Sequence, residues 1–312
     1  MSSDRQSLSS FWAPRYWPTW FGMGVLRLIC LLPHALSMGI GSLIGRAAHA
    51  VGGTRRAIVR RNIELCFPHL TTDERNALTK RHFLALGMSI IEMGLGRWGS
   101  DRLHMRLGHI EGMQHIDAAM KAGKGIILLS AHFTTLEIMG RVLEQVGPTF
   151  SAVYRKNHSA FITELQRTGR ERSADETIEK RDIKKMIRRL RQGGVVWYAP
   201  DQSYDRKGAE VIEFFGVPSM HTTATSVLAR LGKAVTLPFF PQRLADGRYK
   251  FRILPPLEDF PSGNNADDTR KYVSVLEEHI RSCPEQYLWV HRKFKNLPDG
   301  YPELYSDLDA LK

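Results

Sequence analysis

The stretch GIILLSAHFTTLEIMG, residues 125–140, constrains the fold more than any other part of the sequence. Residues 125–130 form a short, uninterrupted apolar run with β-branched Ile126 and Ile127, which predicts a parallel strand covered on both faces. A helix is expected to follow it. Four further runs with strand character alternate with helical patterns: FSAVYR, GGVVWYAPD, KAVTLPFFP and YKFRILPPL. This alternation predicts an α/β fold with its chemistry at the strand ends, and residues 267–295 are expected to form one long amphipathic helix.

A histidine and a glutamate stand where this first strand gives way to the helix. If His132 lies in the junction and Thr134 or Thr135 caps the helix, Glu137 in the first turn can reach back to the imidazole. A carboxylate on Nδ1–H would leave Nε2 to take a proton from an alcohol. That arrangement suits a hydroxyl acyltransferase that forms no acyl-enzyme. The alternative is a core histidine beside a glutamate that caps the helix.

The N-terminal fifty residues have the composition of a membrane-attached segment. FWAPRYWPTW, residues 11–20, holds three of the six tryptophans, as an interfacial aromatic belt would. The apolar run that follows is broken by Arg27 and Pro33, so residues 21–32 are short for a clean span. One tilted anchor over residues 17–45 and a buried helical hairpin in a soluble protein are both open. We expect residues 1–50 to be a membrane anchor or interfacial region and residues 51–312 to be the α/β domain.

The chain is strongly basic. Its 44 Lys and Arg residues against 32 Asp and Glu residues give a net charge of +12, which favours a nucleic acid, an anionic bilayer or an acidic protein as partner. Zinc-knuckle, RNA-binding and recognition-helix signatures are missing from the sequence, so we expect no nucleic acid. Residues 180–194, KRDIKKMIRRLRQGG, predict an amphipathic helix with a cationic face. The spacing of the three cysteines predicts neither a disulfide nor a metal site.

Several long blocks resemble one family in the right order along nearly the whole chain: PRYWPTWFGMGVLRL, RRNIELCFPHLTTDER, GIILLSAHFTTLEIMG, VYRKNH, GGVVWYAPDQSYD, FFGVPSMHTTATSVLAR and PEQYLWVHRKFK. The sequence is similar to the bacterial lipid A secondary acyltransferases, and most of all to their lauroyltransferase branch. The resemblance implies a glycerolipid-acyltransferase-like mixed sheet flanked by helices, with an N-terminal membrane-anchoring helix. It also implies a bacterial inner-membrane enzyme with one N-terminal anchor and its catalytic domain on the cytoplasmic side.

The same resemblance implies the reaction and its partners. A fatty acyl chain, laurate in this branch, would pass from acyl carrier protein to a 3-hydroxyacyl hydroxyl of the Kdo2-lipid IVA precursor, without cofactor or metal. His132 would be the general base and Glu137 its orienting partner in the H-x4-D/E motif. Arg155 would hold a lipid A phosphate or an oxyanion; the alternative is a surface ion pair.

Other matched positions carry roles that are less specific. Asp201 closes a second strand end, where it is either an ionised group beside Arg155 or a helix cap. The stretch DQSYD departs from the family at Ser203 and Asp205, which puts an ion-binding role at Ser203 in doubt. Tyr204 either contacts the acceptor or simply packs.

The block FFGVPSMHTTATSVLAR adds an aromatic-glycine turn and a helix start. Thr222 or Thr223 would contact phosphate or act as an ordinary N-cap. The roles of Trp289 and His291 are open. Two other functions remain possible at this point: an acyltransferase for glycerol phosphate or another glycolipid, and a non-catalytic membrane-surface protein that binds lipid.

Overall fold

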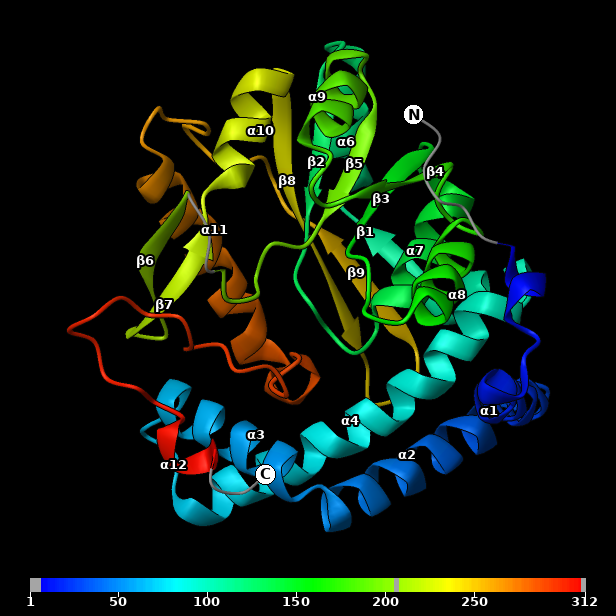
Figure 1. Cartoon of the computed structure of the whole chain (residues 1–312). Coiled ribbons are helices and arrows are strands. Elements are labelled where there is room, and N and C mark those ends of the chain that lie inside the picture. The colour runs from blue at the N-terminus through cyan, green and yellow to red at the C-terminus, as the bar shows by residue number, and fades with distance from the viewer. Residues whose placement is uncertain (1–6, 205–207, 310–312) are drawn as a thin grey trace.

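A seven-stranded mixed sheet forms the centre of the molecule (Figure 1). The computed structural model describes residues 7–204 and 208–309. The strands lie in the order β1-β9-β8-β2-β5-β3-β4, and every neighbouring pair is parallel except β8 with β9. Their bounds are β1 Gly108–Glu111, β2 Gly125–Leu129, β3 Phe150–Tyr154, β4 Glu176–Glu179, β5 Val195–Tyr198, β8 Ala234–Arg243 and β9 Tyr249–Ile253. The predicted α/β class with a mixed sheet is confirmed.

Strand β2 lies in the middle of the sheet and is buried along its whole length. Ile126 and Leu128 join the core on one face, and Ile127 and Leu129 join the core on the other. An uninterrupted apolar run is what such a position requires, because successive side chains point to opposite faces of a sheet.

Helices cover both faces. One core contains apolar residues of α5 Asp101–Leu107, α6 Met113–Lys121 and α7 Leu136–Val146. The opposite core contains those of α9 Ile183–Arg191, α10 Ala224–Gly232 and α11 Asn265–Ser282. Helix α8 spans Ala160–Arg170 beside β3 and β4. The amphipathic helix predicted within residues 180–194 is confirmed as α9, whose Met186 and Leu190 are buried.

The long helix predicted over residues 267–295 is wrong in its second half. Helix α11 ends at Ser282, and a short 3₁₀ turn, η3 Pro284–Gln286, follows it. Proline has no N–H to give to the helix ladder, and it disfavours helical backbone at the residue before it. The chain after η3 therefore leaves the helix axis and returns to the sheet.

A small two-stranded antiparallel sheet lies beside α11. It consists of β6 Ala209–Phe214 and β7 Val217–Thr222. Phe215 and Gly216 both have positive φ, 53° and 76°, at the turn between the two strands. Positive φ at both central residues is typical of a type I′ hairpin. The aromatic-glycine turn predicted here is thus confirmed, although its two strands were not predicted, and neither were β1 and β4.

The N-terminal part is a layer of helices beneath the sheet (Figure 1). Its elements are η1 Leu8–Phe11, η2 Pro14–Tyr16, α1 Trp17–Ile29, α2 His34–Val51, α3 Gly53–Cys66 and α4 Thr72–Trp98, and α12 Ser306–Asp309 lies against α3. Thr71 caps α4 in a capping box with Glu74.

Helix α2 runs along α4, and glycines let the two backbones approach closely. A Cβ at Gly45 would lie 2.2 Å from the carbonyl oxygen of Phe83, and one at Gly87 would lie 2.1 Å from the carbonyl oxygen of Gly41. Any larger side chain at these contacts would push the helices apart.

The single tilted helix considered for residues 17–45 does not form, because the chain turns at Cys30–Pro33 between α1 and α2. Pro33 accounts for the break. Within residues 7–204 and 208–309, every helix is too short or too polar to cross a membrane. The alternative of a buried hairpin does not describe α1 either, because none of its residues is buried.

Candidate active site

The site begins where β2 and β5 end side by side. The two strands are parallel neighbours, so the loops that leave their carboxyl ends start at the same edge of the sheet. Ser130 donates its backbone N–H to the carbonyl of Tyr198 over 2.8 Å, which extends the pairing by one step. This register places His132 in the first loop next to Asp201 in the second.

The imidazole of His132 is held by the carboxylate of Asp201. Nδ1 of His132 lies 2.6 Å from Oδ1 of Asp201, and the backbone N–H of His132 donates to Oδ2 over 3.1 Å. The Asp201 side chain is 2% exposed, while that of His132 is 29% exposed. The carboxylate therefore lies behind the ring, and the ring lies between it and solvent.

Asp201 stays ionised in spite of its burial. Burial alone would raise its pKa, but the charge and hydrogen bonds of His132 and the nearby charge of Lys293 hold the pKa below its usual range. An ionised carboxylate accepts only, so Nδ1 carries the proton and Nε2 is left as the basic nitrogen.

Glu137 does not occupy the position predicted for it. It lies in the first turn of α7, as expected, but its Oε1 is 3.5 Å from Nη2 of Arg170. Nδ1 of an imidazole makes one hydrogen bond, and Asp201 takes it. The carboxylate that contacts Nδ1 thus comes from the loop after β5, where the sequence offered Asp201 only as a charged rim group or helix cap. A contribution of Glu137 to the reaction stays a prediction.

The returning segment after η3 holds the His132 loop in place. Leu288 donates its N–H to the carbonyl of His132 over 3.0 Å, and Thr134 donates to the carbonyl of Gln286 over 2.9 Å. Between them Phe133 and Tyr287 form an isolated antiparallel bridge. The loop is therefore fixed by backbone hydrogen bonds at the histidine itself and two residues after it, which favours a single orientation of the ring.

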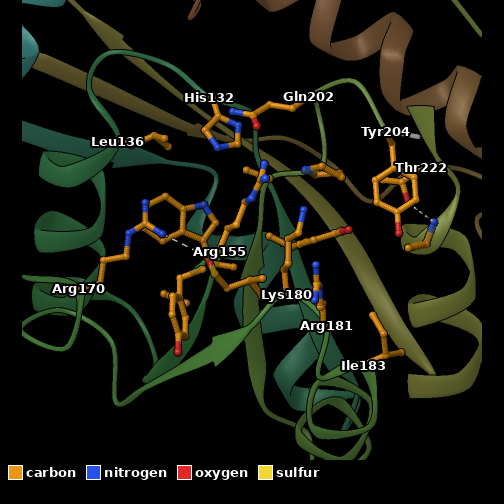
Figure 2. Close-up of a pocket in the computed structure, with 18 of the residues that line it drawn as sticks. His132, Leu136, Arg155, Arg170, Lys180, Arg181, Ile183, Gln202, Tyr204 and Thr222 are labelled. Atoms are coloured by element: carbon orange, nitrogen blue, oxygen red, sulfur yellow. Dashed lines mark hydrogen bonds between the residues drawn. The ribbon is translucent and has the colours of Figure 1, made fainter. Parts of the chain in front are cut away.

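A pocket of about 330 Å³ opens in front of His132 (Figure 2). Four basic side chains from three parts of the chain line it: Arg155, Arg170, Lys180 and Arg181. Arg155 is exposed and follows β3, in agreement with its predicted place near the strand ends. In Figure 2 these groups lie below the His132 ring, so the imidazole and the cations share one space. Such a space suits an anionic substrate that also presents a hydroxyl.

The rest of the pocket wall is partly apolar. Leu136, Val153, Ile183 and Trp197 contribute to it. Nε1 of Trp197 is buried and has no hydrogen-bond partner within the described part of the chain.

The remaining predicted residues divide into two groups. Tyr204 and Thr222 line the pocket, and Tyr204 has Nζ of Lys180 at 6.0 Å from its ring centre. Thr223 is the N-cap residue of α10 but makes no side-chain cap; its hydroxyl donates to the carbonyl of Gly208 over 2.9 Å. Substrate contacts by these residues stay predictions.

Ser203, at the departure from the family pattern, donates its hydroxyl to the carbonyl of Lys295 over 2.8 Å. It therefore ties the loop after β5 to the C-terminal segment. Asp205 lies outside the described residues.

Sequence reasoning missed Arg170, Arg181 and Lys180 as pocket residues, because nothing local distinguishes them from solvated charges. It also missed Lys293. Residues 287–295, YLWVHRKFK, show no alternation of apolar and polar residues, so the sequence held no local signal for Lys293.

The sequence matches one protein family and several named proteins. The family described as bacterial lipid A biosynthesis acyltransferase matches residues 5–296. A lipid A biosynthesis lauroyltransferase of Escherichia coli is 39% identical over 94% of this chain and 96% of its own length. A palmitoleoyltransferase of the same organism is 36% identical over 95% and 96%, and a myristoyltransferase is 26% identical over 96% and 94%.

These relatives cover 94–96% of the chain, and the family match includes the loops of His132 and Asp201 as well as the residues of the basic pocket. The chain therefore belongs to the family of bacterial lipid A biosynthesis acyltransferases.

Proposed function

We propose that this acyltransferase moves a lauroyl chain from acyl carrier protein to a 3-hydroxyacyl hydroxyl of Kdo2-lipid IVA. The observation that carries the proposal is the His132 imidazole, backed by ionised Asp201 and facing a pocket with four cations. A thioester and an alcohol need a base for the alcohol and stabilisation for the developing oxyanion. The pocket offers both.

In the proposed reaction Nε2 of His132 takes the hydroxyl proton as the acceptor oxygen attacks the thioester carbonyl. Asp201 stabilises the imidazolium that forms. A cation of the pocket, Arg155 by its position, stabilises the oxyanion or a phosphate of the acceptor. When the carbonyl re-forms, the C–S bond breaks and the imidazolium returns its proton to the leaving thiolate. An ester and a free phosphopantetheine thiol result.

We propose that Glu137 acts on the same pocket through Arg170. Their 3.5 Å contact would hold the guanidinium towards the acceptor, whose phosphates need fixed positive charge. The two carboxylates would then have separate tasks, since Asp201 orients the base and Glu137 orients a substrate contact.

The basic face of α9 supports the proposal that the acyl donor is an acidic carrier protein. Lys184, Arg188 and Arg191 are exposed at a spacing that places them on one side of the helix. The preceding residues Lys180 and Arg181 line the pocket. A carrier protein that docks on α9 could therefore direct its arm into the pocket, with electrostatic attraction increasing the association rate.

We also propose that the chain attaches to the cytoplasmic face of the inner membrane through α1 and α2, which would lie in the plane of the bilayer surface. Trp17, Phe21, Val25 and Leu28 form an exposed stripe along α1, and Leu31, Leu36 and Leu43 continue it into α2. An apolar face of this size with exposed Arg15, Arg27 and Arg46 beside it is typical of an interfacial attachment to anionic lipid.

Flotation with anionic phosphatidylglycerol–phosphatidylethanolamine vesicles tests the attachment. We expect the triple variant Phe21→Ser, Leu28→Ser, Leu43→Ser to lose about 100-fold or more in partitioning, since each side chain contributes roughly 1.5–3 kcal/mol when buried. The matched control replaces Met105, Met120 and Leu231, which are exposed elsewhere, by serine. Equal flotation of both variants would rule this surface out.

The substrate assignment is tested by mass spectrometry of lipid A from a strain lacking the protein and by assays with labelled acyl carrier protein. We expect the lipid A to lose one lauroyl group, and membranes containing the protein to acylate Kdo2-lipid IVA. Acylation of glycerol phosphate alone would establish the alternative acceptor. An unchanged phenotype with His132→Ala would instead indicate a non-catalytic lipid-binding protein.

A further inference from the structure

A buried lysine lies directly behind the Asp201–His132 pair. Lys293, in the segment that follows η3, is 3% exposed. Its Nζ donates to the carbonyl oxygen of Asp201 over 2.6 Å and lies 3.3 Å from Nε2 of His221. It also lies 4.8 Å from the ring centre of Phe214. The three N–H bonds of the ammonium thus have a carbonyl, an imidazole and an aromatic face around them.

Burying the charged Lys293 side chain costs folding free energy, so fold stability alone does not account for a lysine at this position. Burial lowers the pKa of Lys293 from 10.5 to about 8, although the Asp201 charge opposes the shift. A methionine of similar length would fill the space without that cost, as buried ion pairs replaced by apolar residues often show. A charged lysine kept beside a strongly perturbed carboxylate points to the chemistry of the site.

The buried ammonium of Lys293 is not needed to anchor the C-terminal segment, because other hydrogen bonds already hold that segment in place. The side-chain amide of Asn62 donates to the carbonyls of Trp289 and His291 over 2.6 and 2.7 Å. Tyr305 bonds to Asn62 and accepts the N–H of Phe294. The segment is therefore held on both sides of Lys293 without its ammonium.

We propose that Lys293 is a positioning residue for the acyl transfer, whose ammonium fixes the backbone of Asp201 and shares the negative charge of its side chain. This inference rests on the proposed function. The hydrogen bond from Nζ of Lys293 fixes the backbone carbonyl of Asp201. The carboxylate of Asp201 can then contact both the backbone N–H and Nδ1 of His132 at once.

The ionisable groups around Lys293 decide whether its loss of a proton can be recognised in a pH profile. Three ionisable side chains interact with Lys293: Asp201 from the loop after β5, His221 from β7 and Cys66 from α3. Around Asp201 lie further ionisable groups: His132, Tyr198, Tyr272, Tyr287 and His291. Burial raises the pKa values of Cys66 and Tyr287 well above their usual range, and burial with the Lys293 charge lowers that of His221 well below it. With a pKa of about 8, Lys293 is expected to lose its charge in this range.

The test is the pH dependence of kcat/KM for wild type, Lys293→Met and Lys293→Arg, with lauroyl carrier protein and Kdo2-lipid IVA as substrates. We expect wild-type kcat/KM to fall as Lys293 loses its proton near pH 8. Lys293→Met should lose about 10- to 100-fold at pH 7, since small displacements of a catalytic group cost up to about 100-fold, and should lack the fall near pH 8. Lys293→Arg, which keeps its charge, should recover part of the rate and also lack that fall.

The control is Lys295→Met, two residues away and exposed, which should keep both the rate and the transition. A Lys293→Met enzyme with wild-type rate and profile would overturn the proposal. If both Lys293 variants fail to fold, the wild-type profile decides, because a constant rate from pH 7 to 9.5 with unchanged circular dichroism would also overturn it. Failure of the proposed function looks different, since wild type itself would then transfer no laurate.

Discussion

Asp201 is nearly inaccessible to solvent, yet it keeps a negative charge because each of its acceptor atoms has a donor. The two carboxylate oxygens face Nδ1 and the backbone N–H of His132, and its carbonyl faces Nζ of Lys293. A carboxylate fixed in this way cannot follow the ring if the ring turns. The proton on Nδ1 and the direction of Nε2 are therefore set before substrate binds.

Glu137 should affect acceptor binding more than the chemical step. We expect Glu137→Gln to raise the KM for Kdo2-lipid IVA and to lower kcat/KM by up to about fivefold, since a partly exposed ion pair contributes up to about 1 kcal/mol. The control is Glu144→Gln, on the same helix but paired with Arg141 away from the pocket. Steady-state kinetics with varied concentrations of Kdo2-lipid IVA measure this KM. An unchanged KM in Glu137→Gln would contradict the proposal that Glu137 acts on acceptor binding through Arg170.

At the scale of elements, the helices beneath the sheet depend on close backbone contact. Helix α2 has two kinds of glycine: Gly45 lies against α4, whereas a Cβ at Gly39 would meet nothing within 4 Å. Replacing each glycine by alanine therefore separates the effect of helix packing on stability from the effect of helix propensity.

Gly45→Ala is expected to lower the free energy of unfolding by about 1–3 kcal/mol, the usual cost of forcing extra volume into a packed contact. Gly39→Ala should instead raise it by roughly 0.5–1 kcal/mol, because alanine favours helix over glycine. Urea unfolding in mild detergent, followed by far-UV circular dichroism, measures both. Equal effects of the two substitutions would mean that α2 does not pack on α4 as described.

At the scale of the whole molecule, a buried histidine joins the N-terminal helices to the C-terminal segment. Nδ1 of His82, on α4, lies 2.9 Å from the carbonyl oxygen of Glu285 in η3. Burial lowers the pKa of His82 from 6.5 to about 4, although this hydrogen bond opposes the shift. The unfolded chain therefore binds more protons than the folded one between these two values, and stability falls as pH decreases through that window.

We expect the fold to lose about 2 kcal/mol through His82 alone between pH 7 and pH 5. Urea unfolding of wild type and His82→Gln at the two pH values measures this: the difference between pH 7 and pH 5 should shrink by about that amount in the variant. His158→Gln, at an exposed position, should leave it unchanged. An equal pH difference in wild type and His82→Gln would show that His82 is not buried in its neutral form.

The sequence predicted features that depend on neighbours along the chain. The apolar run of β2 and the amphipathic α9 appear in local spacing, and so does the junction position of His132. The carboxylate that contacts His132 lies 69 residues away, and the lysine behind it lies 92 residues further on. Periodicity carries no information about such partners. The resemblance identified the family, but the contact between Asp201 and Nδ1 emerged only from the parallel register of β2 and β5.

The most direct test of the account is the kcat of Asp201→Asn with lauroyl carrier protein and Kdo2-lipid IVA at saturating concentrations. An asparagine keeps the shape of the side chain but cannot stabilise the imidazolium, so kcat should fall about 10²- to 10⁴-fold, close to the loss in His132→Ala. A folded Asp201→Asn enzyme that keeps kcat within threefold of wild type would contradict the assignment of Asp201 as the partner of the base.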